Sequence, residues 1–309
     1  MLSKVAERVY WTARYLERIE STARLISIYD KLLFDLPRSV HLSWYNLITI
    51  NSLDKDFSER YEVRDERNVV KFLIGDESNG SSIVSSLKAV RENVRTTRDV
   101  IPADVWYMIN ELSMYTQENL MQGINRSKRY DFLNEIIHGC QKILGTLYSD
   151  MPRDAAWEFL RLGRNLERAD MTTRNIDAAV SAILETEKLG EAVNSHQIIW
   201  LNLLCSLNAD HSYRRTMHES VKGQAVVEYL LMNKAFPKSV GYCLSSMANA
   251  GRRLPNASEV RDEILAIKLE YIIDYTAEDL GVALRNYLNE LQIRIIGMHQ
   301  KISATWFTA

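Results

Sequence analysis

Arginine and glutamate side chains recur at helical spacing near the start of the chain, in a combination that can form buried ion pairs or bind an anion. The residues concerned are Arg14, Glu17, Arg18, Glu20 and Arg24. The planar guanidinium group of arginine pairs bidentately with carboxylates and phosphates, and a carboxylate held among arginines can act as an acid or a base. These residue types therefore suit either an ion-pair network within the protein or a site for an anionic ligand.

The same pattern recurs 150 positions later, so that Arg164 corresponds to Arg14. The second set consists of Arg164, Glu167, Arg168, Asp170 and Arg174. Glu20 is answered by Asp170, and neither stretch contains the helix breakers Gly or Pro. Self-similarity at a fixed offset indicates an internal repeat. We therefore predict a duplicated helical unit with one charged motif in each copy.

The charged residues of the first motif form an island on a helix that is otherwise apolar. At about 100° per residue they occupy about a third of the circumference, and Leu25 and Leu32 lie near the centre of the same face. A helix that is apolar nearly all round is usually buried, and buried charges are tolerated only when they are paired. We expect a partly buried, mutually paired Arg/Glu network in preference to a solvated face.

Two interpretations of this network stay open. The motifs either lock the two copies together, which the physics of buried charge favours, or leave guanidinium groups free for an anionic ligand. In the second case, Glu17 or Glu167 would serve as acid or base. Further charged residues would then line the cleft; these are Arg91, Glu92, Arg95 and Arg98.

Long helices must position both motifs. We predict one helix from about Lys4 to Phe34, ended by Leu36-Pro37, and a second from about Ala156 to Glu187, started by Pro152. The further predicted helices are His41–Ser52, one capped by Ser81 or Ser82, one opened by Pro102, Lys128–Tyr148, Ser258–Tyr275 and Ala277–Phe307. The remaining segments are residues 54–67, expected to be a loop with a helical end, and residues 69–74, whose secondary structure the pattern leaves open.

The correspondence between the halves extends beyond the charged motifs. Trp44-Tyr45-Asn46-Leu47 matches Trp200-Leu201-Asn202-Leu203 at an offset of 156. Ser82-Ile83 matches Ser239-Val240 at an offset of 157. Several segments in one order with slowly drifting offsets are hard to explain by chance.

These patterns predict the fold class and the division of the chain. We expect an all-α fold, a helical bundle built from two duplicated units of about residues 1–150 and 151–255. Residues 256–309 are expected to form a C-terminal helix pair without a counterpart. No linker rich in Pro, Gly or Ser separates the halves, so the units should share one core in a single compact domain.

A polar turn precedes the helix that carries Arg91. Its notable residues are Asp76, Asn79, Ser81 and Ser82, and the corresponding turn of the second half holds Pro237 and Ser239. Such residues bond to their own backbone in turns and cap helices. Free N–H groups at a helix N-terminus can also hold a phosphate or carboxylate, but Asp76 and Glu77 would repel an anion there. Helix capping is the role we expect.

Composition narrows the class of protein. The chain has 309 residues, 46% of them apolar, and a net charge of −2. This balance argues against nucleic-acid or anionic-membrane binding. The three cysteines are widely spaced, the first residues lack the apolar core of a signal peptide, and no apolar stretch is long enough to span a bilayer. We expect a cytoplasmic protein.

The sequence shows no established catalytic motif. It has no phosphate-binding Gly-rich loop, no nucleophile elbow and no aspartate-rich pair. Glu135 and His138 have the spacing used in di-iron bundles, but such sites need a second pair and two more glutamates. We therefore expect no metal site and no cofactor.

Several motifs agree in order with those of one family. They are Tyr15-Leu16-Glu17-Arg18-Ile19-Glu20, the Phe72–Ile83 turn, Arg91-Glu92-Asn93-Val94-Arg95, Gly163-Arg164-Asn165-Leu166-Glu167-Arg168-Ala169-Asp170 and Phe236-Pro237-Lys238-Ser239-Val240. These motifs extend over nearly the whole chain. In them the chain resembles the alpha-E family, which consists of all-helical bacterial proteins and is named for a conserved Glu-Arg motif. One departure is Gly80, where the family usually has proline, which loosens the turn.

The resemblance implies a role through partners. Genes of the alpha-E family typically neighbour those of a circularly permuted ATP-grasp protein and a transglutaminase-like protein, and the ATP-grasp and alpha-E parts are sometimes fused. It implies a peptide- or amide-forming modification system in which the ATP-grasp partner activates a carboxylate.

Three hypotheses follow. The leading one is a helical scaffold that docks an ATP-grasp ligase and positions its peptide or protein substrate. The alternative is a stand-alone enzyme or a protein that binds an anionic ligand through the paired Arg/Glu motifs. A purely structural homo-oligomer also fits the sequence.

Overall fold

All regular secondary structure in the described part of the chain is α-helical. The computed structural model describes residues 2–35, 43–188, 192–267, 269 and 280–308. The predicted all-α class is confirmed. The two longest helices, α1 (Ser3–Asp35) and α9 (Ala155–Lys188), carry the charged motifs and match the predicted ranges to within one residue at each end. Leu36-Pro37, predicted to end the first helix, lies outside the described residues.

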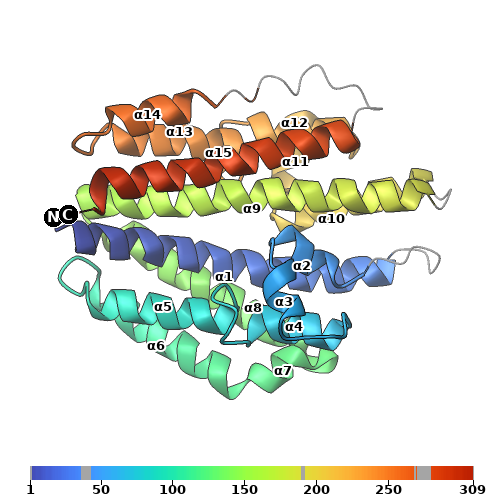
Figure 1. Ribbon diagram of the computed structural model, residues 1–309, viewed down its shortest axis with the longest axis horizontal. Coiled ribbons are helices and arrows are strands. Elements are labelled where there is room, and N and C mark those ends of the chain that lie inside the picture. Colours follow the sequence, from blue (N-terminus) through green and yellow to red (C-terminus); the bar gives the residue numbers. More distant parts are fainter. Residues whose placement is uncertain (1, 36–42, 189–191, 268, 270–279, 309) are drawn as a thin grey trace.

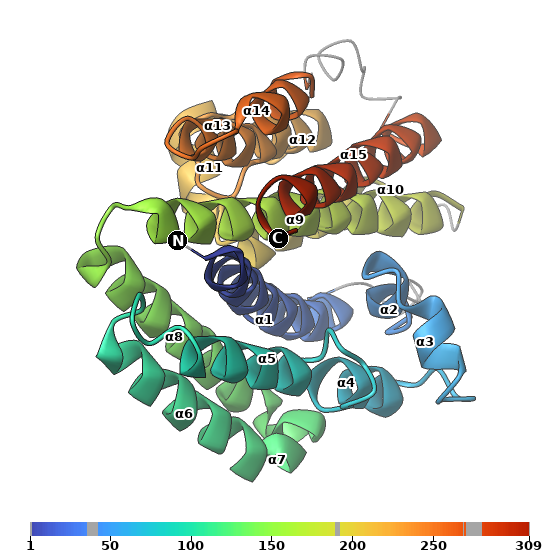
Figure 2. The ribbon, with the colours of Figure 1, turned by 60° about the vertical axis from the view of Figure 1, so that its left-hand side comes forward.

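Helices α1 and α9 lie side by side at the centre of the molecule and run in the same direction (Figure 1). Each belongs to a group of four helices. In the first group, α5 and α8 pack on α1, and α6 packs on α5 and α8; in the second, α13 and α15 pack on α9, and α14 packs on α13 and α15 (Figure 2). The bounds are α5 Ile83–Arg95, α6 Ala103–Glu118, α8 Arg126–Asp150, α13 Val240–Gly251, α14 Ser258–Leu265 and α15 Val282–Trp306.

Shorter helices connect and flank these groups. They are α2 Asn46–Ile50, α3 Asp54–Ser58, α4 Glu66–Ile74, α7 Leu120–Ile124, α10 Ala192–Ser206, α11 Asp210–Met217 and α12 Gly223–Met232. The predicted helix His41–Ser52 was too long, since the described part is helical only over α2. The predicted loop 54–67 is helical at its start and at its last two residues, and residues 69–74 belong to α4.

The C-terminal helices differ from the prediction in their bounds. Helix α14 ends at Leu265 instead of Tyr275, although residues 268 and 270–279 lie outside the described part. Helix α15 begins at Val282 instead of Ala277. It has 25 residues, as does α8, and packs on α9 as α8 packs on α1. This likeness reaches beyond residue 255, where we expected the second unit to end; the duplication itself stays a prediction.

One hydrophobic core extends through both groups of helices. The approach of α1 to α9 is close at Gly163, where a Cβ atom would clash with the backbone oxygen of Tyr10. The residue 150 positions earlier is Ala13, also small and fully buried. Small residues at these two positions let the central helices approach closely enough for the charged side chains just beyond them to meet.

Both ends of the chain lie at the same end of the molecule (Figure 1). The ring of Phe307, directly after α15, packs against the ring of Tyr10 on α1 with a centroid distance of 5.2 Å. Among the described helices, none combines the length and hydropathy needed to cross a bilayer.

Candidate functional site

Glu167 on α9 accepts hydrogen bonds from two arginines of α1. Arg14 Nε donates to Oε2 at 2.8 Å. Arg18 donates through Nε to Oε1 at 2.5 Å and through Nη2 to Oε2 at 3.0 Å. The Arg18 contact is the bidentate geometry that makes arginine–carboxylate pairs strong.

Glu17 on α1 is held in the same way by two arginines of α9. Arg164 Nε donates to Oε2 at 3.2 Å. Arg168 donates through Nε to Oε1 and through Nη2 to Oε2, both at 2.7 Å. The two Glu-Arg motifs therefore contact each other, and the bonding of one is repeated in the other.

Helix geometry explains this reciprocity. Arginines four residues apart lie on one face of a helix, one turn apart, with the glutamate of the same motif between them in sequence. Because α1 and α9 run in the same direction with their motifs at the same level, the glutamate of each helix faces the arginine pair of the other. We call Glu17, Glu167 and these four arginines the inner layer.

The two carboxylates of the inner layer are buried and ionised at neutral pH. Glu17 and Glu167 are each 1% exposed. Burial alone would raise the pKa of Glu167, but the charges of Arg18 and Arg14 and their hydrogen bonds outweigh it and lower the pKa to about 2. Arg168 and Arg164 outweigh burial in the same way and lower the pKa of Glu17 to about 2. The predicted partly buried, mutually paired network is present.

The guanidinium groups respond to the same neighbours. For Arg14 and Arg168, burial would lower the pKa, but the glutamate that each one contacts raises it above the ordinary value. Arg164 behaves differently, because burial and the nearby charge of Arg168 lower its pKa. All four arginines belong to an arrangement in which every carboxylate oxygen accepts at least one hydrogen bond.

A second pair of acids lies about one turn further along each helix. Glu20 accepts a hydrogen bond from Arg24 at 2.9 Å, and Asp170 accepts one from Arg174 at 2.8 Å. Lys238 Nζ also approaches Glu20, at 3.6 Å. We call Glu20, Arg24, Lys238, Asp170 and Arg174 the outer layer.

The predicted turns hold the inner layer from outside. Arg18 Nη1 donates to Ser81 Oγ at 3.3 Å, and Arg168 Nη1 donates to the carbonyl of Pro237 at 3.2 Å. Ser82 and Ser239 cap α5 and α13, as their residue type predicts. Each arginine thus connects the opposite glutamate to the N-terminal turn of a helix in its own half.

The other turn residues stabilise the turn itself. Asn79 is buried, donates to the carbonyl of Phe72 at 3.0 Å and accepts from the N–H of Ser81 at 2.9 Å. Asp76 accepts from the Tyr61 hydroxyl at 2.7 Å and from the N–H of Ser78 at 2.9 Å. Because these hydrogen bonds hold the turn in place, the Asn79 and Asp76 side chains have structural roles.

The charged residues of α5 and of the turn after it do not join the network. Arg91 donates to Asn110 on α6 at 2.7 Å, and Arg98 stacks on the Trp106 ring at 4.1 Å. Arg95 pairs with Glu92 at 2.8 Å, where both side chains are more than half exposed. These contacts lie within α5, between α5 and α6, and between α6 and the turn after α5. The structure thus separates this set from the inner layer.

Several buried polar residues were missed at the sequence level. Lys238 lies in a motif that we had noted, but a lysine in a polar turn is normally solvated. Arg129 is 1% exposed and pairs with Glu66 at 2.8 Å. His299 stacks on Tyr10 and contacts its hydroxyl at 3.0 Å, and burial together with the charge of Arg14 lowers the His299 pKa to about 4.

A cavity of about 200 Å³ adjoins the inner layer on the side of the α4–α5 turn. Its polar lining comes from Arg14, Arg18, Thr22, Asn51, Ser81, Glu167, Asp170 and Arg174. Its apolar lining includes Leu53, Leu73, Met171 and Ile296. The cavity brings residues of both central helices and of the polar turn to one place.

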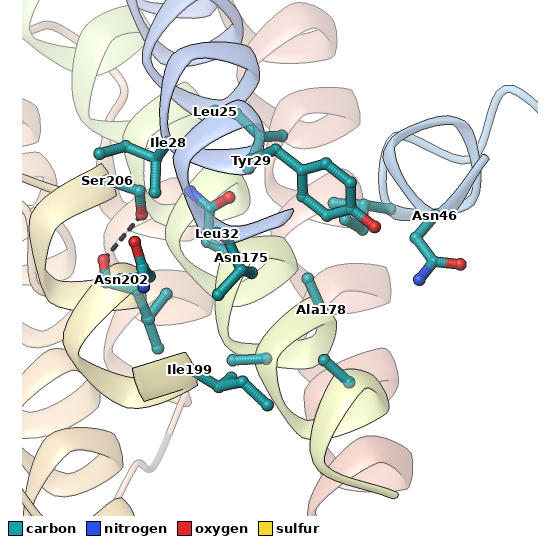
Figure 3. Close-up of a pocket in the computed structure, with 14 residues that line it drawn as sticks. Leu25, Ile28, Tyr29, Leu32, Asn46, Asn175, Ala178, Ile199, Asn202 and Ser206 are labelled. Atoms are coloured by element: carbon teal, nitrogen blue, oxygen red, sulfur yellow. Dashed lines mark hydrogen bonds between the residues drawn. The ribbon is translucent and has the colours of Figure 1, made fainter. Parts of the chain in front are cut away.

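A smaller apolar cavity lies further along the same helices, where α10 packs against both of them (Figure 3). Leu25, Tyr29 and Leu32 of α1 face Asn175 and Ala178 of α9 across it. Its volume of about 50 Å³ is room for a few water molecules. We therefore regard the cavity beside the inner layer as the better candidate for a ligand.

The family of the chain follows from comparison with known proteins. Residues 1–307 match the Alpha-E family, described as a predicted alpha-helical domain with a conserved ER motif. No curated protein and no solved structure matches the chain. The chain has Glu-Arg pairs at Glu17-Arg18 and Glu167-Arg168, the residues at the centre of the inner layer. Since the match covers nearly the whole sequence, the chain belongs to the Alpha-E family.

Proposed function

We propose that this protein is the helical partner subunit of an ATP-grasp-type peptide or amide ligation system in the cytoplasm. In this role it docks the ligase and positions the peptide or protein substrate. The observation that carries the proposal is the inner layer, in which each buried glutamate is satisfied by two arginines of the opposite helix. Such a layer fixes α1 against α9 and gives a rigid frame.

The protonation state of the inner layer supports a scaffold in preference to an enzyme built on Glu17 and Glu167. A general acid or base works best when its pKa lies near the operating pH. Both carboxylates have a pKa of about 2, so at neutral pH neither holds a proton to donate and both are weak bases. The paired Glu-Arg motifs are therefore better suited to holding helices together than to proton transfer.

The outer surface offers apolar side chains for docking. Tyr107 and Met114 of α6 are 68% and 60% exposed. They are seven residues apart, two helical turns, and so lie on one face of α6. Exposed aromatic and methionine side chains are enriched at protein interfaces. The ligase is the partner that the family resemblance suggests, and a transglutaminase-like protein is a second.

Association with the ligase tests the proposal. The full chain and a circularly permuted ATP-grasp protein from the same organism are mixed and weighed by mass photometry. We expect a complex that is weakened when Tyr107 and Met114 are both changed to Ser. Ile293→Ser, at a residue of α15 that is 60% exposed, serves as the matched control. Absence of any complex at micromolar concentration would refute the docking role.

A ligand-binding role is the second candidate, and the cavity beside the inner layer favours it. That cavity is lined by three arginines, Arg14, Arg18 and Arg174. Binding there requires no proton transfer by Glu17 or Glu167. The chemistry of a suitable ligand follows from the difference between the two halves of the outer layer.

A further inference from the structure

The outer layer is asymmetric although the motifs that form it correspond. On α1, Glu20 has two cationic neighbours, Arg24 at 2.9 Å and Lys238 at 3.6 Å. On α9, Asp170 has the matching arginine, Arg174, at 2.8 Å. No second cation pairs with it among the described residues.

A single residue difference accounts for this asymmetry. At the offset of 157 that relates the two polar turns, Lys238 corresponds to Ser81. The lysine side chain is 15% exposed, so its ammonium group lies inside the protein beside Glu20. A serine cannot reach as far. Within the described residues, no side chain therefore fills the position beside Asp170 that corresponds to the Lys238 ammonium group.

Two observations show that this place could receive a ligand. Ser81 and Asp170 both line the cavity of about 200 Å³. Asp170 Oδ1 is buried and has no hydrogen-bond partner within the part of the chain that the structure describes. A buried carboxylate oxygen without a donor is costly. Burial, together with the nearby charge of Glu167, raises the Asp170 pKa despite Arg174.

The rest of the cavity lining indicates what else the ligand carries. Three guanidinium groups, those of Arg14, Arg18 and Arg174, line it together with only two carboxylates, Glu167 and Asp170. A lone ammonium group would add to this excess of positive charge. A ligand that brings both an ammonium and a carboxylate group satisfies Asp170 without adding net charge.

We propose that this cavity binds a free α-amino acid, with its ammonium group at Asp170 Oδ1 in the place that corresponds to the Lys238 ammonium group. The Ser81 and Thr22 hydroxyls lie in the same lining and can accept further hydrogen bonds from the ammonium group. The ligand carboxylate faces Arg14 and Arg18. The volume of the cavity, about 200 Å³, is below the roughly 300–1,000 Å³ of pockets for drug-sized ligands. A volume of this size suits a free amino acid.

The side chain of the amino acid would meet apolar groups. The rest of the lining consists of Leu53, Leu73, Met171 and Ile296, with the uncharged Asn51, so an apolar side chain is preferred over a charged one. The role of the site in supplying an amino acid to a ligase rests on the proposed function. Binding itself does not, because the isolated chain contains every residue of the cavity.

Calorimetry with the isolated full chain tests the ligand class. The probes are L-leucine, N-acetyl-L-leucine, which lacks the ammonium group, and L-leucinamide, which lacks the carboxylate. Each group removed takes away charge-assisted hydrogen bonds, so we expect each analogue to bind at least about tenfold more weakly than L-leucine. If L-leucine and L-alanine both fail to bind at millimolar concentration, or if either analogue binds as tightly as L-leucine, the proposal is wrong.

A variant that supplies its own ammonium group separates binding from folding. Ser81→Lys should fill the place beside Asp170, raise the melting temperature of the free chain and abolish L-leucine binding. The matched control is Gly80→Lys, one residue earlier, where a side chain meets open space; it should bind L-leucine as the wild type does. Unchanged L-leucine binding in a folded Ser81→Lys protein would overturn the proposal, whatever the outcome of the ligase experiment.

Discussion

The inner and outer layers are neighbours on the same two helices, yet they have diverged differently. In the inner layer, Glu17 and Glu167 each accept hydrogen bonds from the two corresponding arginines of the opposite helix, and both glutamates are 1% exposed. In the outer layer, Glu20 has a lysine that Asp170 lacks. A symmetric layer in which every carboxylate oxygen accepts a hydrogen bond suits a constant structural task. An asymmetric layer beside a cavity is where a difference between the halves can serve a ligand.

Breaking the inner layer should have the largest effect. Glu17→Ala leaves Arg164 and Arg168 without their carboxylate, and Glu167→Ala does the same to Arg14 and Arg18. Removing one side of a buried ion pair costs about 3–5 kcal/mol. We expect losses of this size, similar for the two variants, in the free energy of unfolding measured with urea.

Glu92→Ala is the control for these two variants. Glu92 pairs with Arg95 on the surface of α5, where both side chains are more than half exposed. Its replacement should leave the urea midpoint unchanged. Much smaller losses for Glu17→Ala and Glu167→Ala than expected, or a large difference between them, would contradict a symmetric structural layer.

Acid should weaken the inner layer without any mutation. The pKa of Glu17 and of Glu167 is about 2 in the folded protein, against 4.5 ordinarily. A folded pKa below the unfolded one gives stability that is present above pH 4.5 and is lost as the pH falls towards 2. The loss is on the order of 3 kcal/mol for each carboxylate.

Urea unfolding at pH 7, 5 and 3 measures this dependence. The Glu167→Gln protein, if folded, should lose less stability than the wild type between pH 5 and pH 3, because it has one titrating carboxylate fewer. Equal losses in the two proteins over this interval would show that Glu167 does not supply the acid sensitivity.

The next largest effect on stability is expected from a change in the distance between α1 and α9. Gly163→Ala places a Cβ atom against the backbone oxygen of Tyr10, so α1 and α9 must move apart beneath the inner layer. Overpacking of this kind typically costs about 1–3 kcal/mol. Gly297→Ala on α15 is the control, since its added atom meets nothing within 4 Å. A thermal melt in which both variants match or exceed the wild type would argue against the tight contact.

The outer layer should give the smallest change in stability. Lys238→Ser makes the second half resemble the first, and Glu20 keeps its ion pair with Arg24. We expect a loss of about 1 kcal/mol in the free energy of unfolding. The control is Lys234→Ser, since Lys234 is exposed in the same turn as Lys238 and outside any helix. Losses as large as those for Glu17→Ala would mean that the two layers share one task.

Sequence reasoning predicted the long elements well and the short ones poorly. Helices α1 and α9 were placed to within a residue at each end because each has many apolar residues at helical spacing. The short helices α2 and α3 offer only one or two turns of pattern. Tertiary contacts decide their bounds, so the predicted helix over residues 41–52 was too long.

The candidate site was predicted in part. Paired, buried charges followed from the apolar surroundings of the first motif, but the pairing of Glu17 with Arg164 and Arg168 depends on the direction and level of two distant helices. Arg91 and Arg95 have similar spacing on α5, and nothing local distinguishes a solvated arginine from a buried one. Lys238 was missed for a related reason, since its burial requires the acid of another helix.

The contact between Phe307 and Tyr10 brings the two ends of the chain to one end of the helices. A protein tethered to either end by linkers of similar length would therefore search much the same volume, at a similar effective concentration. Fusing a ligase before α1 or after α15 should consequently present it to the same surfaces. The order of the two parts in a fused chain would then matter less than the length of the linker between them.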